Sequence, residues 1–348
     1  MKRESFPTPA AALRLLVTLA IAAGGVVVCS ALGVPLPWLL GPLFACLAAA
    51  LLGVPMRASR LAGESMRTVL GLAVGASITP ALFDRLESMA GSVALIPPFI
   101  LLIGLVGVPY FRRLCGFDPA TSYYAAMPGG LQDMLVFGEE AGGDPRALSL
   151  IHATRVLVIV TLLPFLLAWW MDARFERPPG VAAAALPWEQ AVLMVGLAVA
   201  GWRIALRIGL FGASILGPLI LATVASLAGV LEQRPPAEAI LAAQFFIGMG
   251  IGVKYAGITA AELRRIVLAA VGFTLILGAL SALVAAGVIA LELAPPMEAL
   301  LAFAPGGQAE MAVLAIVAGA DVAFVVAHHV VRIVIVIVGA PVAARWMR

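Results

Sequence analysis

Two residue pairs in this chain have the types and the spacing to act on an ion. His152 precedes Arg155 by three positions, and His329 precedes Arg332 by three positions, 177 residues further along. A spacing of three places both members of a pair on one face of a helix. Imidazole changes charge near neutral pH, so each histidine could carry a coupling proton. Each guanidinium could bind a carboxylate, backbone carbonyls or an anionic substrate.

The surroundings of both arginines indicate that they face the interior of the protein. Val-Leu-Val-Ile-Val follows Arg155 and Ile-Val-Ile-Val-Ile follows Arg332, and a charge on so apolar a helix is costly. The alternatives are direct contact with a substrate and a structural role, in which the two histidines are hydrogen-bonded interior residues. The structural role predicts local ion pairs: Arg155 with Asp133 or Asp144, and Arg332 with Glu310 or Asp321.

A helix-breaking segment precedes each pair. Pro128-Gly129-Gly130 in the first half matches Pro305-Gly306-Gly307 in the second half at the same offset. Proline removes a backbone donor and adjacent glycines favour a turned backbone, so each segment, roughly 120–141 and 298–318, should form two short pieces that meet at the break. Irregular backbone at membrane depth persists only where protein buries it or where it lines a watery cavity.

A short helix is expected to restart after each break. A helix N-terminus has free N–H groups and partial positive charge, which favour an anion. The acidic residue of each first turn either caps its own helix or binds a coupling H⁺ or Na⁺. The predicted substrate- and ion-binding residues are Pro128, Gly129, Gly130, Gln132, Asp133, His152, Arg155, Pro305, Gly306, Gly307, Gln308, Glu310, His329 and Arg332.

Composition indicates a membrane protein. Hydrophobic residues make up 63% of the 348 residues, charged residues 12%, and the mean hydropathy is +1.08. That is too little charge to cover a soluble protein, and the repeated apolar runs of about 20 residues are typical of membrane-spanning helices. The net charge of +3, without a basic patch, argues against nucleic acid. Three cysteines without CxxC spacing (Cys29, Cys46 and Cys115) are predicted to be inert thiols.

The pattern predicts an all-α polytopic membrane protein of about ten transmembrane helices. The first repeat is residues 1–175, the second is 186–348, and 176–185 form a polar linker with prolines. The first apolar run is read as a retained helix rather than a signal peptide, because it is long and leads directly into another helix. The predicted helices are 14–32, 36–53, 66–83, 90–111, 147–171, 186–205, 212–231, 238–256, 266–291 and 322–343.

Charge in the loops favours one topology. If both broken segments enter and leave on one side, 16 Lys and Arg residues lie in the cytoplasm and four lie outside; if both span, the count is 13 against seven. Cytoplasmic loops carry excess Lys and Arg, so re-entrant segments are favoured, with both termini cytoplasmic. Five spanning helices per repeat is an odd number. The two five-helix repeats are therefore predicted to be inverted, an arrangement typical of transporters in the bacterial inner membrane.

These motifs resemble the Gram-negative membrane AbrB family, whose members carry the AbrB duplication and which is unrelated to the soluble transcription regulator of that name. The resemblance rests on WLLGP (Trp38 to Pro42) with LGP (Leu216 to Pro218), the two PGG blocks and the paired His/Arg positions. It covers nearly the whole chain, although the second block reads PGGQAEM where the first reads PGGL. Members have been labelled ammonia monooxygenases and regulators of another gene's expression.

The predicted function is secondary transport of a small, possibly anionic solute, coupled to H⁺ or Na⁺. The alternatives are a membrane sensor or regulatory protein that affects gene expression indirectly, and a membrane metal monooxygenase. A copper or iron site needs several converging ligands, and the chain has only three histidines, so no enzyme activity, metal or cofactor is expected. The expected partners are the lipid bilayer, the solute and its coupling ion, with no nucleic acid; a homodimer is an open possibility.

Overall fold

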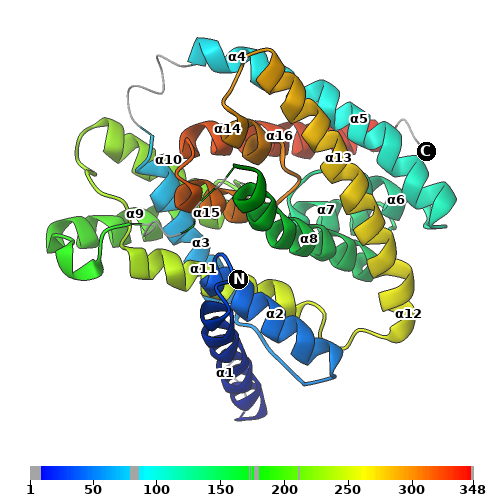
Figure 1. Ribbon diagram of the computed structural model, residues 1–348, viewed down its shortest axis with the longest axis horizontal. Coiled ribbons are helices and arrows are strands. Elements are labelled where there is room, and N and C mark those ends of the chain that lie inside the picture. Colours follow the sequence, from blue (N-terminus) through cyan, green and yellow to red (C-terminus); the bar gives the residue numbers. More distant parts are fainter. Residues whose placement is uncertain are drawn as a thin grey trace.

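The computed structural model describes residues 9–78, 86–171, 173, 175, 180–210 and 212–345, and in those ranges the chain is helical with no strand (Figure 1). The all-α polytopic prediction is confirmed. The helices of the first repeat are α1 (Pro9–Ala31), α2 (Pro37–Leu51), α3 (Arg60–Gly75), α4 (Leu86–Ala94), α5 (Ile96–Pro109), the π-helical turn η2 (Tyr110–Leu114), α6 (Pro119–Ala126), α7 (Leu131–Glu140) and α8 (Pro145–Met171).

The second repeat follows the same order. After the 3-10 turn η3 (Ala183–Ala185) come α9 (Trp188–Arg207), α10 (Ala213–Leu227), α11 (Ala237–Val253), α12 (Ala260–Glu262), the π-helical turn η4 (Leu263–Val267), α13 (Leu268–Ala290), α14 (Pro296–Phe303), α15 (Gln308–Ala318) and α16 (Val322–Arg345). Part of the predicted linker 176–185 lies outside the described residues.

Six helical segments of the described chain are long and apolar enough to cross a membrane: Pro9–Ala31, Met89–Leu114, Pro145–Met171, Trp188–Arg207, Ala260–Ala290 and Val322–Gly339. The other four predicted spans correspond to α2, α3, α10 and α11, which have 15 to 17 residues. A helix of that length is at or below the minimum needed to cross the hydrocarbon core.

Several predicted boundaries differ from those of the structure, and two of the differences have a clear physical reason. The third helix begins at Arg60 rather than 66, because the Ser59 hydroxyl caps it by accepting a hydrogen bond from the Ala62 N–H at 3.2 Å. The fourth predicted helix is divided between α4 and α5 at Leu95. Pro97 and Pro98 occupy the first turn of α5 and lack the N–H groups that would continue the hydrogen bonds of α4.

Glycines permit close helix contacts at equivalent places in both repeats. A Cβ on Gly25 of α1 would strike the Gly41 carbonyl of α2, and a Cβ on Gly201 of α9 would strike the Gly217 carbonyl of α10. Small residues let helix backbones approach closely in membranes. Each repeat therefore begins with the same crossed pair of helices.

The third helix of each repeat packs against the second helix of the other repeat. Gly71 of α3 lies against the Ile215 carbonyl of α10, and Gly248 of α11 lies against the Leu39 carbonyl of α2. These glycines therefore serve helix packing. Since α3 and α11 are equivalent by sequence, as are α2 and α10, each repeat completes the packing of the other.

The equivalent long helices α5 and α13 run antiparallel, side by side (Figure 1). The Tyr110 hydroxyl, just beyond the end of α5, donates to the Ala269 carbonyl near the start of α13 at 3.0 Å. At the other end, Gly91 of α4 lies against the Leu293 side chain, just after α13. The end of one helix therefore lies beside the start of its counterpart.

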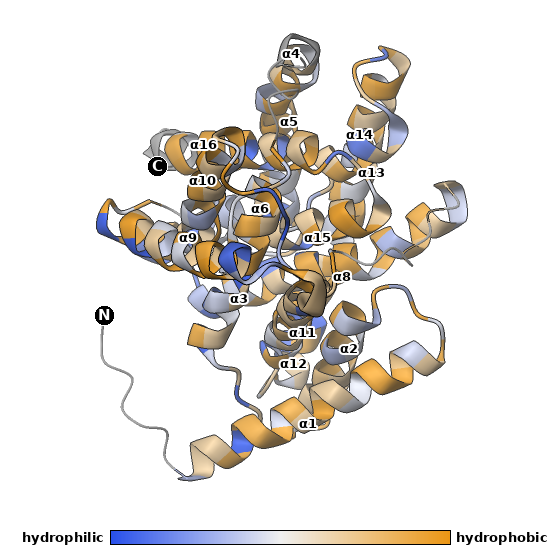
Figure 2. Ribbon diagram, turned by 90° about the vertical axis from the view of Figure 1, so that its left-hand side faces the viewer, coloured by the Kyte–Doolittle hydropathy of each residue, from blue (hydrophilic) through white to orange (hydrophobic). Residues whose placement is uncertain are grey.

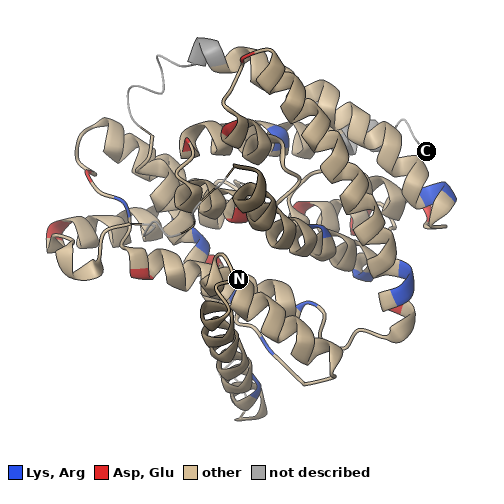
Figure 3. Cartoon of the chain, in the orientation of Figure 1, with Lys and Arg blue, Asp and Glu red and all other residues tan. Residues whose placement is uncertain are grey.

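The helices form two bundles. In Figure 1, α1, α2, α3, α9, α10 and α11 lie toward the left and the bottom, and the remaining helices lie toward the top and the right. Helix α1 is largely hydrophobic along its length (Figure 2). Charged residues fall mainly on loops and helix ends (Figure 3). Large apolar side chains such as Leu16, Trp169 and Val195 are exposed, as expected for a surface that faces lipid.

Candidate functional site

Each PGG break is the tip of a helical hairpin. In the first hairpin, α6 and α7, the Asp144 N–H donates to the Thr121 hydroxyl at 2.8 Å, which joins the residue after the hairpin to its first turn. In the second, α14 and α15, the Asp321 N–H donates to the Glu298 carboxylate at 3.1 Å. The chain therefore enters and leaves each hairpin at the same end, and it reverses direction at the break.

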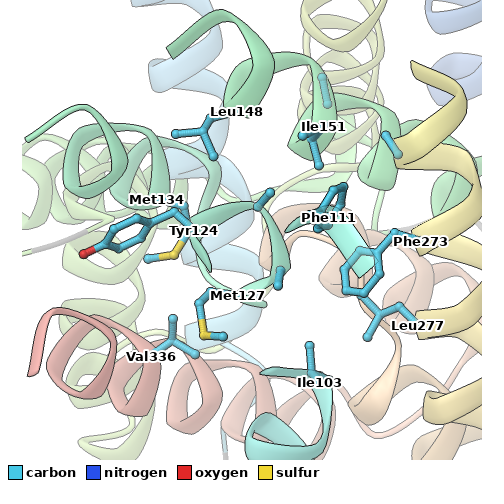
Figure 4. Close-up of a cluster of buried hydrophobic side chains, with 14 of the residues drawn as sticks. Ile103, Phe111, Tyr124, Met127, Met134, Leu148, Ile151, Phe273, Leu277 and Val336 are labelled. Atoms are coloured by element: carbon cyan, nitrogen blue, oxygen red, sulfur yellow. The ribbon is translucent and has the colours of Figure 1, made fainter. Parts of the chain in front are cut away.

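Both tips pack against a methionine one turn into the second helix of the hairpin. The Met134 side chain packs on Gly129, and the Met311 side chain packs on Gly306, where a Cβ would collide with the sulfur. Met127 and Met134 of the first hairpin lie in one buried apolar cluster with Tyr124 (Figure 4). Because glycine has no side chain, the methionine side chain can pack directly against the backbone of each turn.

The first His/Arg pair binds the backbone of the first hairpin. The guanidinium of Arg155, on α8, donates to the Met127 carbonyl at 3.1 Å and to the Gly129 carbonyl at 3.0 Å. The His152 Nε2 lies 3.1 Å from the Tyr124 carbonyl. These carbonyls lie where α6 ends, so the pair supplies donors for groups that no longer have a helical partner.

The second pair repeats this geometry on α16. The Arg332 guanidinium donates to the Ala304 carbonyl at 2.9 Å and to the Gly306 carbonyl at 3.0 Å. The His329 Nε2 lies 2.9 Å from the Leu301 carbonyl. Each carbonyl bound by the second pair belongs to the residue 177 positions after the one bound by the first pair. We call these four side chains the clasps, because each contacts the backbone of a hairpin at or near its tip.

The predicted carboxylate partners of the arginines are not the groups that bind the guanidinium nitrogens. The Asp144 carboxylate instead accepts from the N–H groups of Arg146 and Ala147 at 2.8 and 3.1 Å and so caps α8. The Asp321 carboxylate accepts from the Phe324 N–H at 3.0 Å and caps α16. The prediction of these pairs was wrong because caps and carbonyl ligands are set by where each helix breaks.

Each clasp side chain has one nitrogen that makes no hydrogen bond to the tips. His152 and His329 are fully buried, and Arg155 and Arg332 are 3% and 4% exposed. Among the described residues, no group hydrogen-bonds the Nδ1 of either histidine or the Nε of either arginine. Because Nε2 faces a carbonyl in both rings, it is the donor, and Nδ1 is then an acceptor in the neutral tautomer.

The side chains of Asp133 and Glu310 fold back onto the N-termini of their own helices, α7 and α15. Each is the third residue of its helix, and its carboxylate occupies the space that a Cβ on Gly130 or Gly307 would need. This geometry is that of an acidic residue at a helix N-terminus. Of the glutamines predicted beside them, the Gln308 amide nitrogen is buried with no partner in the described chain, and the Gln132 side chain lies outside the described residues.

Charges from both repeats meet near the tips. Arg155 interacts electrostatically with Glu310 of the other repeat and with Arg332. Lys254, at the end of α11, also interacts with Glu310. The arrangement brings together residues that sequence analysis could only assign to separate halves. Lys254 is absent from the predicted site residues. The sequence feature that could have indicated it is a lone lysine directly after an apolar helix.

Two buried contacts tie neighbouring helices to this cluster. The hydroxyls of Tyr255 and Thr154 lie 2.7 Å apart, which links the end of α11 to α8. The His328 Nε2 lies 2.9 Å from the Ser92 hydroxyl of α4, although this histidine has no counterpart in the first repeat.

The tips are closed off from solvent by protein. Pro128, Gly129, Pro305 and Gly306 are all buried. A cavity of about 90 Å³ lies instead at the open end of the second hairpin, where Glu298, Asp321 and Phe324 line it together with Met89 and Leu293 to Pro295. Across the described ranges, His, Cys, Asp and Glu form no group of three or more that could hold a metal ion.

The six long apolar helices and the exposed apolar side chains define an all-helical polytopic membrane protein. Residues 38–348 match the family described as "Transition state regulatory protein AbrB", so the chain belongs to the AbrB family. It is also similar to the uncharacterized protein YhjN of Bacillus subtilis (strain 168), with 28% identity over 347 residues, which covers 92% of this chain and 89% of that protein.

Proposed function

We propose that this protein is a secondary transporter of a small anionic solute, coupled to H⁺ or Na⁺. The observation that carries the proposal is the buried charge cluster shared by the two repeats. Arg155 and Arg332 bring two buried positive charges to the hairpin tips, and the buried Glu310 lies in the first turn after the second tip. Ionisable groups are costly inside a membrane and are retained there for ion or substrate pathways.

We further propose that the repeats are inverted in the bacterial inner membrane, with both termini in the cytoplasm. Two observations support this. The equivalent helices α5 and α13 are antiparallel, so the hairpins that follow them start at opposite ends of the helix pair. Each hairpin also returns to its starting end. In this arrangement both hairpins are re-entrant, one from each side, and broken segments near the midplane form the substrate site.

Transport in this proposal is a movement of the bundle that contains the hairpins against the bundle of α1 to α3 and α9 to α11. Each bundle draws helices from both repeats, and α8 and α15 lie at the contact between the two bundles. Alternating access by one rigid part moving against another is the usual mechanism for repeats of this kind.

The test is uptake by the purified protein in liposomes under an imposed H⁺ or Na⁺ gradient, with labelled mono- and dicarboxylates, phosphate and sulfate, and a neutral amino acid for comparison. Wild type should concentrate one class of anion. Asp133→Asn and Glu310→Gln should lose gradient-driven uptake, whereas Glu64→Gln, which alters an acidic residue paired with Arg60 on α3, should keep it. Normal gradient-driven uptake by both site variants would show that these carboxylates do not couple transport.

A further inference from the structure

A cavity lies between the start of α1 and the loop that follows α2. Its volume is about 360 Å³, and it is lined by Ala10, Ala11, Arg14, Met56 and Arg57. Ala10 and both arginines are exposed, so the cavity opens to the surroundings of the protein. A water molecule in the liquid occupies ~30 Å³. The cavity can therefore admit a phosphate group together with the glycerol that carries it.

A buried hydroxyl holds the two arginines of this cavity beside each other. The Thr18 hydroxyl donates to the Arg14 carbonyl at 2.7 Å and accepts from the Arg57 N–H at 3.0 Å, and Thr18 is fully buried. Within the described part of the chain, no carboxylate forms an ion pair with either guanidinium. A guanidinium offers a planar fork of donors that matches a phosphate. Two such forks at one cavity favour a phosphate ligand.

The second repeat shows that this contact between helix and loop does not require an arginine. Gln190 of α9 stands where α1 has Arg14, at the offset that relates the glycines of the two crossed helix pairs. The Gln190 side-chain amide donates to the Val230 carbonyl at 3.1 Å and accepts from the Glu232 N–H at 3.2 Å. In the first repeat Thr18 connects helix and loop instead. The Arg14 guanidinium takes no part in that contact and is available to a ligand.

Exposed apolar side chains lie next to the cavity on α1. Leu13 and Leu16 are 62% and 63% exposed, and Val17 is also exposed. Val17 follows Arg14 by three positions, so the two side chains are neighbours on the helix surface. Helix α1 lies at the lower edge of the molecule in Figure 2 and is long and apolar enough to cross a membrane. A ligand with an anionic head and hydrocarbon chains would match both the cavity and this surface.

We propose that this cavity binds the headgroup of an anionic phospholipid from the surrounding bilayer. Arg14 and Arg57 bind the phosphate oxygens, and the acyl chains lie along Leu13, Leu16 and Val17. In the topology proposed above, this end of α1 is at the cytoplasmic face, where anionic lipids attract arginine and lysine. The bound lipid fixes the start of α1 to the loop after α2. This site does not depend on the transport function.

The test is lipid binding by the purified protein in a neutral detergent. The protein is titrated with short-chain phosphatidylglycerol, and bound lipid is counted by native mass spectrometry beside thermal unfolding. Phosphatidylglycerol should bind saturably and raise the unfolding temperature. Phosphatidylcholine of the same chain length, which has no net charge, should bind more weakly. Glycerol 3-phosphate, which lacks acyl chains, should also bind more weakly; an affinity equal to that of the lipid would overturn the proposal and assign the cavity to a soluble phosphate.

Matched variants locate the binding. Arg14→Gln introduces the residue of the second repeat, and Arg57→Gln makes the same change on the loop. Both keep the hydrogen bonds to Thr18, which use backbone atoms. Each should weaken phosphatidylglycerol binding about fivefold, which corresponds to ~1 kcal/mol. The control is the double variant Arg112→Gln with Arg113→Gln, two exposed arginines of η2, and it should bind the lipid as wild type does.

A second variant separates the placement of the arginines from their charge. Thr18→Val removes the hydroxyl that holds Arg14 and Arg57 together but removes no charge, and it should weaken phosphatidylglycerol binding. Thermal unfolding without lipid verifies that each variant is folded. Three results would overturn the proposal: no saturable binding by wild type, equal losses in the cavity variants and in the control, or unchanged binding in Arg14→Gln and Arg57→Gln.

Discussion

Arg155 holds the carbonyl oxygen of Gly129 at 3.0 Å, and Arg332 holds that of Gly306 at the same distance. Each arginine thus binds the central residue of a proline-glycine-glycine break from the helix that follows the hairpin, α8 or α16. The same guanidinium also binds the residue just before the proline. Two fixed donors on one planar group set the curvature of the tip in a way that a single donor could not.

The arginine clasps should therefore not tolerate lysine. An ammonium is a point charge without the fixed fork of a guanidinium, so Arg155→Lys and Arg332→Lys should each lose about 1–3 kcal/mol of stability by leaving a tip carbonyl unpaired. Thermal unfolding in detergent measures the loss. The two variants should be affected alike, since their hydrogen bonds are equivalent, and a shift in only one of them would contradict the structural equivalence of the clasps.

The histidine clasps should act locally. His152→Ala removes the donor to the Tyr124 carbonyl and should increase hydrogen exchange of the amides in the first hairpin while the second stays protected. His329→Ala should produce the reverse pattern. Equal loss of protection in both hairpins after a single substitution would mean that the tips are held as one unit.

Two glycines of α11, two positions apart, should respond in opposite ways to alanine. A Cβ on Gly252 would collide with Cys46 and the backbone of α2, whereas a Cβ on Gly250 meets no atom. Gly252→Ala should destabilise the protein. Gly250→Ala should be neutral or stabilise it by up to about 1 kcal/mol, because alanine has the higher helix propensity. Thermal unfolding of the two variants, measured side by side, decides whether α2 and α11 pack as described.

Single cysteines at the open ends of the hairpins should report the membrane orientation. Gly142, just after α7, and Glu292, just before α14, are both exposed. In a variant whose three native cysteines are replaced, Cys at position 142 should react with an impermeant thiol reagent from the cytoplasm, and Cys at position 292 from outside. Labelling of both from one side would rule out inverted repeats.

The elements of the fold were largely predictable because membrane helices leave a strong signal in sequence. Apolar runs located all ten predicted helices. Proline and glycine marked both breaks, and the common offset identified the repeat. The exact ends of α2, α3, α10 and α11 were not predicted, since they depend on loops and on caps such as Ser59 rather than on hydrophobicity.

Residue roles within the site were harder to predict. The sequence placed His152 and Arg155 on one helix face but left open what they face, and only the fold brings the carbonyls of Tyr124 and Gly129 to them. The approach of Glu310 to Arg155 joins positions in different halves. No spacing rule links such residues, because their contact arises from how the two repeats pack against each other.

The packing of α2 and α3 against helices of the other repeat has a consequence for the origin of the chain. One repeat by itself leaves the glycine surface of α3 and its partner surface on α2 uncovered, because both are completed by α10 and α11. A single-repeat ancestor would have covered them by pairing with a second copy of itself about a two-fold axis, because each copy supplies both surfaces to the other. Gene fusion would then have made that dimer permanent and freed the copies to diverge, as Arg14 and Gln190 have done.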